Sequence, residues 1–391
     1  MSATPAFISP SVLRWARQRS GLSVDELAQR VNTRPDRLTA WEQGDRRPSI
    51  RQAEHVAGAL HIPFGYLFLS EPPNETLPIA DFRSGTQFKG SMPSADLIDV
   101  LNDAIIKQQW YREFLREENR ARVPFVGQFR DSTDSIRIAR SIRETIGIST
   151  AVRGEASNWE GFLSEIVKRS EAIGILVLKS GIVGGNPHRR LKPEEFRGFT
   201  INDEFAPLIF VNGADARAAQ IFTLAHELAH IWIGQSGVSD EKMNRITDVL
   251  DSRVEVLCDH IAAEVLVPSE EFKSHWDQQL SVEMNIQVVS RHFKVSRLVA
   301  LRRGFDLGKI DREAFLREYK TVEGQYRLQE EEREGGNFFP TLFVRNSATF
   351  TRTVIGAVND GHALYREAAQ LLNVKVPTVA KVIAYAEGKA Q

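Results

Sequence analysis

The segment 222–231 reads FTLAHELAHI and contains His226, Glu227 and His230 in the pattern H-E-x-x-H, within a run of good helix formers. Residues four apart on a helix face the same way, so the two imidazoles can bind one metal ion while Glu227 lies beside the open coordination position. This pattern predicts zinc-assisted hydrolysis of a peptide bond. The alternative is a helix that carries two packed or exposed histidines, and the downstream sequence argues against it.

A second helix offers a carboxylate for the same site. Residues 254–265 are apolar at helical spacing, and Glu255 stands there about 25 positions beyond His230. Zinc hydrolases commonly use two His and one carboxylate and leave the fourth position to water, which makes Glu255 the predicted third ligand. Asp259, one turn further on, is predicted to accept the second ring N–H of a zinc-bound histidine, for which we favour His226. A solvated helix face is the alternative for these two carboxylates.

The whole region resembles a known family. Residues 212–233, followed by E-x-x-C-D-x-I-A-A-E-V-L-V-P ending at Pro268, are similar to the ImmA/IrrE family of bacterial metallopeptidases. The resemblance implies a zincin-like α+β domain, for which we expect residues 150–270. It also implies that Glu227 is the general base. The three zinc ligands that it implies are His226, His230 and Glu255.

Three positions depart from the pattern of that family, and none of them removes a ligand. Ala219 stands where the family usually has Arg, with Arg217 two residues earlier; Cys258 replaces Ala, and Asp259 replaces Asn. Because Cys258 is the only cysteine, the chain has no internal disulfide framework. Two accounts of Cys258 are open: a small buried residue in place of Ala, or a redox switch whose oxidation displaces the helix and disarms the site.

The sequence also suggests how a substrate is held. The apolar run 207–211 is predicted to be a strand that pairs with an extended substrate by strand addition. Further strands are expected at 173–178 and 199–201. The group that stabilises the oxyanion is not singled out, since His188, Arg217 and tyrosines are all candidates.

Another motif lies near the N-terminus. Residues 9–70 contain nine Arg, no Lys and six Asp plus Glu, whereas the whole chain has a net charge of −1. Pro35 suits a first helical turn and Gly44 a helix end. The patterns L-S-x-x-E-L-A, L-T-x-W-E-x-G and P-S-x-x-x-A-E-x-V-A-x-A-L resemble the XRE family of helix-turn-helix domains. Four short helices are therefore predicted, around 13–17 and at 24–31, 34–44 and 50–62.

In such a domain the third helix enters the major groove of DNA. The side chains expected to reach base edges are Arg34, Arg37 and Thr39. Those expected to contact phosphates are Arg46, Arg47 and Arg51. Asp36 places a negative charge nearby, and an interaction domain that does not bind DNA is the alternative. A single domain of this kind binds weakly, so we expect a homodimer on an operator of its own or a neighbouring gene.

The remaining chain is predicted to be mainly helical. We expect a linker and helical segment at 71–149, with helices at 95–120, 133–148 and, beyond the linker, 157–172, and a helical C-terminal region at 271–391. The C-terminal region contains two stretches that look like further helix-turn-helix units, and the charged run 329–336 between them is expected to be a break. Neither a membrane-spanning run nor a signal-peptide core is present, which favours a cytoplasmic protein without a membrane partner.

These observations predict a DNA-binding transcriptional regulator with a zinc-dependent endopeptidase domain that cleaves a protein partner. The alternative is an antitoxin-type regulator of a toxin–antitoxin operon, in which the metallopeptidase fold mainly binds a toxin. Retention of Glu227 favours the peptidase.

Overall fold

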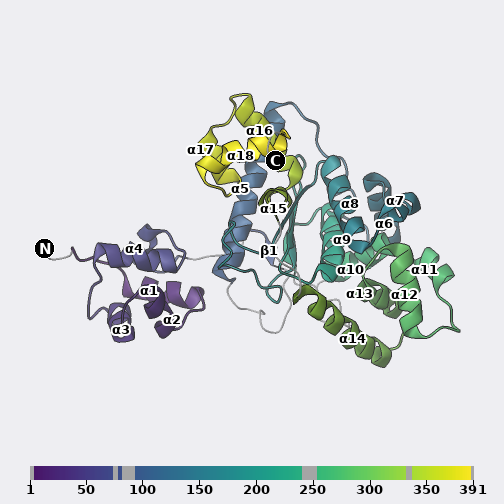
Figure 1. Ribbon diagram of the computed structural model, residues 1–391, viewed down its shortest axis with the longest axis horizontal. Coiled ribbons are helices and arrows are strands. Elements are labelled where there is room, and N and C mark those ends of the chain that lie inside the picture. Colours follow the sequence, from purple (N-terminus) through teal and green to yellow (C-terminus); the bar gives the residue numbers. More distant parts are fainter. Residues whose placement is uncertain (1–3, 74–77, 82–92, 240–252, 332–336, 389–391) are drawn as a thin grey trace. The chain divides into compact units, whose positions relative to one another are not determined.

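The computed structural model describes residues 4–73, 78–81, 93–239, 253–331 and 337–388 (Figure 1). Within these residues, one compact unit holds the N-terminal helices, and a second unit holds the strands together with the chain from Val100 onward. The boundaries at 150 and 270 that the sequence suggested fall inside the second unit. None of the helices in the described residues is long and apolar enough to span a membrane.

The first unit is the helical domain that the sequence predicted. Its helices are α1 (Pro10–Arg19), α2 (Val24–Arg30), α3 (Pro35–Gln43) and α4 (Ile50–Ala59), followed by the 3₁₀ helix η1 (Phe64–Phe68). Capping boxes start two of them, since the side chains of Ser23 and Ser49 accept hydrogen bonds from the N3 backbone of α2 and α4. Pro35 is the first residue of α3, and Gly44 ends that helix with a φ of 84°.

The core of the first unit is apolar and is closed by one ion pair. Leu13, Leu38 and Trp41 are buried in it. Arg17 donates to both carboxylate oxygens of Glu42, at 2.6 and 3.0 Å, and so ties α1 to α3. Helix α3 is therefore held on its inner side by packing and by charge, while its other side is exposed.

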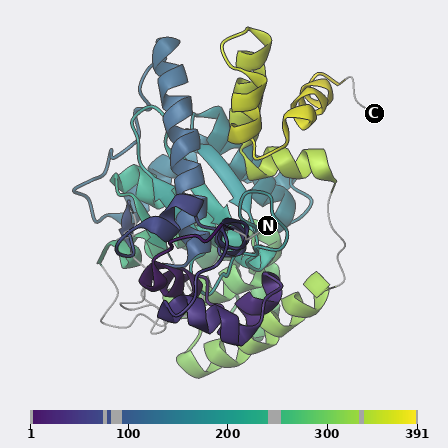
Figure 2. The same cartoon turned by 90° about the vertical axis from the view of Figure 1, so that its left-hand side faces the viewer.

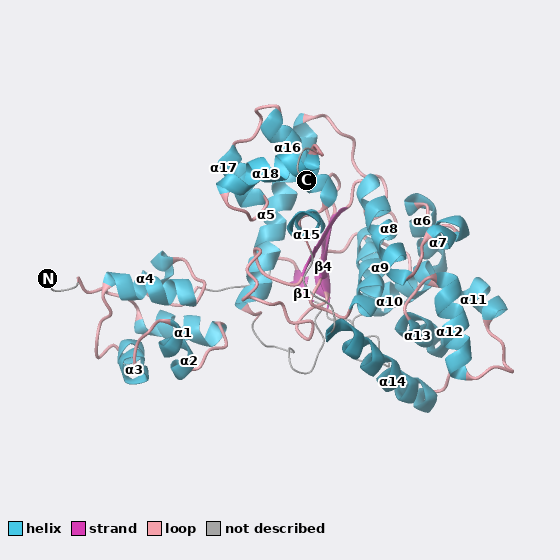
Figure 3. Ribbon diagram, viewed as in Figure 1, coloured by secondary structure: helices cyan, strands magenta, loops and turns pink. Residues whose placement is uncertain are grey.

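The second unit is built around a mixed sheet, whose strands are magenta in Figure 3. Its strand order is β1-β5-β3-β4-β2. The strands are β1 (Ala80–Asp81), β2 (Leu176–Ser180), β3 (Gly198–Ile201), β4 (Leu208–Asn212) and β5 (Gly237–Ser239). β3 runs antiparallel to its neighbours β4 and β5, whereas β2 is parallel to β4 and β1 is parallel to β5. β2 begins a few residues later than the run 173–178 had suggested.

The expected role of the run 207–211 in strand addition is wrong. This run forms β4, which is hydrogen-bonded to β3 on one side and to β2 on the other. Its backbone groups are already used by the sheet, so no edge is left for a substrate. Sequence periodicity identified the strand but could not show that it is internal.

Helices α8 (Trp159–Ala172), α9 (Arg217–Ile233) and α10 (Arg253–Leu266) lie on one side of the sheet (Figure 1). α9 packs directly on β3 and β4, and α10 packs on α9 and on α6 (Ser135–Ile146). α7 (Thr150–Glu155) connects α6 to α8. The buried apolar side chains of these helices form one continuous core. The sheet therefore supports α9 directly. Helix α10 is held beside α9 by its packing on that helix and on α6.

After Pro268 the chain is helical, as the sequence predicted. The helices are α11 (Ser269–His275), α12 (Val282–Phe293), α13 (Arg297–Asp306) and α14 (Arg312–Glu331). Helix α14 includes residues 329–331 of the charged run 329–336, which was expected to be a break. Residues 332–336 lie outside the described residues. A buried ion pair between Arg303 and Glu264 joins α13 to α10, and Glu264 also accepts from the backbone of Ser269 at 3.0 Å.

The last helices form a cluster that docks on α5 (Ala95–Glu117) and α8. They are α15 (Phe338–Arg345), α16 (Ala348–Asn359), α17 (Tyr365–Leu371) and α18 (Val376–Ala386), drawn in yellow-green and yellow in Figure 2. Glu171 at the end of α8 accepts from the first backbone amides of α16, and Trp110 of α5 donates to Glu367 at 2.7 Å. In the core of this cluster Leu342, Phe350, Val354 and Val358 are buried and Phe339 and Phe343 are half-buried, whereas Val344 is 47% exposed.

Candidate metal centre

Helix α9 carries His226, Glu227 and His230, and all three side chains are completely buried. The helix is apolar along most of its length, which explains why it packs into the core, and Gly234 ends it with a φ of 74°. Three buried ionisable groups on one apolar helix are costly unless they are paired or bind a metal.

Glu255, at the first turn of α10, faces both histidines. Its Oε2 lies 3.4 Å from Nε2 of His226, and its Oε1 lies 3.2 Å from Nε2 of His230. The two Nε2 atoms are 3.0 Å apart. The structure therefore brings together the three residues that the sequence proposed as ligands, with two nitrogens and a carboxylate converging on one point.

Asp259, one turn beyond Glu255, contacts the other side of the first imidazole. Its Oδ1 lies 3.2 Å from Nδ1 of His226. This contact fixes the ring so that Nε2 faces the common point, which is the arrangement proposed for a residue that orients a metal ligand. Asp259 thus contacts His226, the histidine that the sequence favoured as its partner.

Strand β3 contacts the side chain of Glu227 from the sheet side of α9. Thr200 donates its hydroxyl to Oε2 of Glu227 at 2.7 Å. Oε1 has no hydrogen-bond partner among the described residues, and a Cβ on Gly198 would come within 2.7 Å of it. Sequence reasoning missed Thr200 and Gly198, because no local pattern shows which strand passes under the helix.

The electrostatics of the site follow from burial and from close charges. Burial raises the pKa of Glu227. Burial also opposes ionisation of Glu255, but hydrogen bonds from His226 and His230 lower its pKa to about 2. For His230, burial acts to lower the pKa, yet the nearby Cys258 sulfur and the Glu255 carboxylate raise it well above the usual value. The anionic carboxylate of Glu255 thus lies against His230, whose pKa is raised.

This donor set fits a divalent metal. Two imidazole nitrogens and a carboxylate are the ligands of catalytic zinc sites, and a buried, unpaired carboxylate oxygen beside them suits a general base that meets a water molecule only when the site is loaded. The ligand atoms of His226, His230 and Cys258 also lie within 4.8 Å of one another. Cys258 is completely buried.

Two of the residues considered for the oxyanion, Arg217 and His188, start from positions outside the H-E-x-x-H turn. Arg217 begins α9, nine residues before His226 and so roughly 13 Å away along the helix, and it lies 3.6 Å from Glu160. His188 is exposed in the loop after β2. These positions place neither side chain beside the cluster, so the group that stabilises the oxyanion stays open.

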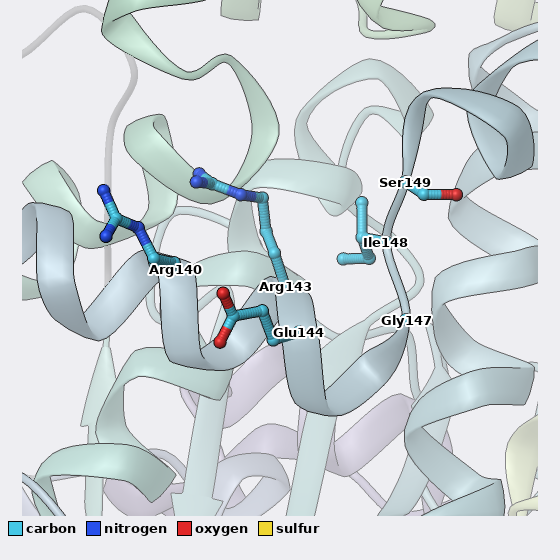
Figure 4. Close-up of a pocket in the computed structure, with 6 residues that line it drawn as sticks. All are labelled: Arg140, Arg143, Glu144, Gly147, Ile148 and Ser149. Atoms are coloured by element: carbon cyan, nitrogen blue, oxygen red, sulfur yellow. The ribbon is translucent and has the colours of Figure 1, made fainter.

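A surface pocket of about 630 Å³ lies elsewhere in the second unit (Figure 4). It is formed by the end of α6 and the turn into α7, and its lining contains Arg140, Arg143 and Glu144. None of its lining residues belongs to the cluster on α9 and α10, and we assign it no role. Residues 240–252, which connect β5 to α10, lie outside the described residues.

In the first unit, the residues expected to read bases lie on α3 or at its start. Arg34 precedes the helix and donates two hydrogen bonds to Asp36, at 3.0 and 2.6 Å. Arg37 is exposed, with its guanidinium 5.9 Å from the ring of Trp41. Thr39 donates to the carbonyl of Pro35 at 3.0 Å. The charge of Asp36 is thereby offset by Arg34, which leaves Arg37 as the more available cation.

The residues expected at phosphates surround the turn between α3 and α4. Arg46 and Arg47 are exposed in this turn, and Arg51 is exposed in the first turn of α4. The guanidinium of Arg47 stacks over the ring of Phe7 at 4.0 Å. Two exposed arginines in the turn and a third at the start of α4 suit contact with a phosphate backbone.

Together, the H-E-x-x-H helix on a mixed sheet and the carboxylate helix beside it define a zincin-like metallopeptidase fold, which here follows a helix-turn-helix domain. Residues 171–304 match the family model described as IrrE N-terminal-like domain, and residues 13–67 match the model described as Helix-turn-helix. The chain thus joins an XRE-type helix-turn-helix domain to an ImmA/IrrE-like peptidase-family domain, as both resemblances implied.

One further match concerns the C-terminal cluster. Residues 346–384, which include most of α16 to α18, match the model Domain of unknown function (DUF8813). A search of curated proteins finds no match to the chain.

Proposed function

We propose that this protein is a transcriptional regulator that binds DNA through its helix-turn-helix domain and cleaves a peptide bond of a protein partner in its IrrE-like domain. The observation that carries the proposal is the convergence of His226, His230 and Glu255, with Glu227 buried beside them. Zinc is the metal that this donor set favours.

The residues divide the work of hydrolysis. His226, His230 and Glu255 would hold the zinc ion, which when bound lowers the pKa of a water molecule and polarises the substrate carbonyl. Glu227 takes the proton from the attacking water, and its raised pKa suits a base that must later return the proton to the leaving amine. Asp259 keeps His226 in the orientation that presents Nε2.

The antitoxin-type alternative is supported by no comparison. A fold that only binds a toxin needs neither a buried general base nor a carboxylate aligned with two histidines, because both are costly to bury without a catalytic use. The orientation of Thr200 toward Glu227 likewise favours catalysis.

The test combines metal analysis with a search for cleavage products. Purified wild type is expected to hold about one zinc per chain, the double variant His226→Ala/His230→Ala none, and Glu227→Gln the wild-type amount. New protein N-termini are expected in cells that express wild type but not in cells that express Glu227→Gln. Full zinc in the double variant would overturn the ligand set, and identical N-termini with Glu227→Gln would overturn the peptidase.

The proposal for the first unit is operator binding as a homodimer. Arg34, Arg37 and Thr39 would face bases, and the arginines of the α3–α4 turn would face phosphates. Footprinting of the promoter regions near the gene is expected to give two protected half-sites about one helical turn apart. The absence of protection at physiological salt would favour an interaction module instead.

A further inference from the structure

We propose that the sulfur of Cys258 is a fourth protein ligand of the metal centre, so that the resting site is closed to water. The inference rests on the proposed metal site but goes beyond it, because hydrolysis by two His and one carboxylate needs an open fourth position.

The first support is geometric. Cys258 lies three residues after Glu255 on α10, so both side chains are on neighbouring parts of one helix face. Its Sγ, one ring nitrogen of His226 and one ring nitrogen of His230 lie within 4.8 Å of one another. Ligands of one tetrahedral zinc, with bonds of about 2.0–2.3 Å, are separated by roughly 3.5 Å. Closing the set around an ion therefore requires a movement of only about 1 Å.

The second support is that the sulfur of Cys258 is buried close to the two histidines. Cys258, His226 and His230 are all completely buried. A cysteine that merely fills space could turn its sulfur toward the apolar side chains of the core. Here the sulfur lies instead within 4.8 Å of a ring nitrogen of His226 and of a ring nitrogen of His230. A thiolate in a water-poor pocket beside two imidazoles is a strong ligand for zinc.

The two states of such a site differ in which group occupies the fourth position. In the closed state His226, His230, Glu255 and the sulfur of Cys258 would hold the ion, which is the ligand number of structural zinc sites. In the open state Cys258 would be released as a thiol, with a proton taken up from water, and the three other residues would hold the ion. No oxidant is required, and Glu227 lies beside the position that water then enters.

The experiment replaces zinc by cobalt(II), because a thiolate bound to cobalt gives an intense near-ultraviolet charge-transfer band and nitrogen or oxygen ligands do not. Wild type and Glu227→Gln, each loaded with one cobalt per chain, are expected to show the band. Cys258→Ala and Cys258→Ser, with the same measured cobalt content, are expected to lose it. Glu227→Gln is the matched control, since it changes the same pocket without removing a ligand.

The outcomes separate this inference from the proposed function. Cobalt bound in wild type without the band would overturn the inference and leave the ligands His226, His230 and Glu255 in place. Failure of wild type to bind cobalt or zinc at all would overturn both. A second readout is metal retention: Cys258→Ala is expected to lose zinc to a chelator faster than wild type, and equal rates would contradict a fourth bond.

Discussion

Thr200 on strand β3 donates a 2.7 Å hydrogen bond to Oε2 of Glu227 on helix α9. This contact fixes one oxygen of the proposed base, while the other, Oε1, has no hydrogen-bond partner among the described residues. The base is therefore positioned by a strand that precedes it by about 27 residues in the sequence.

Removing the hydroxyl is expected to slow catalysis without removing metal. Thr200→Val should lower hydrolysis about 10- to 100-fold, because a hydrogen bond to a charged group is worth about 1.5–3 kcal/mol. Since that bond lowers the pKa of Glu227, its loss should move the acidic limb of the pH–rate profile to higher pH. Thr200→Ser keeps the hydroxyl and should behave like wild type. An unshifted limb in Thr200→Val would argue against Glu227 as the base.

Asp259 is expected to matter for metal affinity. Asp259→Ala removes the acceptor that faces Nδ1 of His226 and should weaken zinc binding about 10- to 100-fold. Asp259→Asn keeps an oxygen acceptor, and it is also the residue usual in the resembled family, so its loss should be smaller. Competition with a chelating dye measures both affinities, and equal losses in the two variants would show that the contact does not orient the ligand.

Gly198 is expected to tolerate no side chain. In Gly198→Ala the new Cβ would lie 2.7 Å from Oε1 of Glu227 and 2.8 Å from Cγ2 of Thr223. Overpacking of this kind costs about 1–3 kcal/mol and displaces the carboxylate. Urea unfolding should show the loss of stability. Gly356→Ala, on a helix and with nothing within 4 Å, is the control and should be neutral or stabilising.

The two groups of arginines should affect DNA binding differently. Arg37→Ala is expected to relax preference at one base position, whereas Arg46→Ala should weaken binding to all sequences alike and reduce the salt slope by about 1. Binding titrations at several salt concentrations measure both effects. Arg116→Ala, in the second unit, is the control and should change neither; a sequence-specific loss in Arg46→Ala would reverse the assignment.

The α11–α12 contact should make stability depend on pH. Glu271 accepts from His292 at 2.8 Å and from Arg153 at 3.0 Å, while His275 contacts its backbone carbonyl. Burial opposes ionisation of Glu271, but these contacts lower its pKa overall. A lowered carboxyl pKa gives stability that is present above the unfolded value of about 4.3 and is lost as the pH falls through the folded value.

Glu271→Gln should therefore lower the free energy of unfolding by roughly 1 kcal/mol at neutral pH, since solvent screens these partly exposed contacts, and by less near pH 3. Denaturant unfolding at both pH values measures the difference. Glu270→Gln is the matched control, because Glu270 is 86% exposed and pairs only with nearby Lys273 among the contacts described. A deficit in Glu271→Gln that did not shrink in acid would exclude the charge as its cause.

Local spacing explains what the sequence could predict. The four-residue intervals His226 to His230 and Glu255 to Asp259 place pairs of side chains on one helix face, so the candidate ligands follow from the helix itself. The helix-turn-helix domain was predictable for the same reason, since its caps and apolar positions are local.

What the sequence could not predict depends on sheet order. The strand 208–212 was recognisable, but its central place between β3 and β2 is set by contacts far apart in the chain, and this ruled out strand addition. Thr200 and Gly198 belong to the site only through the pairing of β3 with β4. The direction of the Cys258 sulfur likewise depends on how α10 is rotated against α9.

Gly198, which lies against the proposed base Glu227, also constrains the register of strand β3. Gly198 and Thr200 lie on the same face of β3, two residues apart, with Gly198 opposite Val211 and Thr200 opposite Ile209. A slip of one residue would turn the apolar face of β3 over, and a slip of two would keep that face but drive the side chain of Thr200 or Phe196 into the carboxylate of Glu227. A misaligned β3 therefore would not pack against α9, and the register of the sheet and the geometry of the proposed metal site depend on each other.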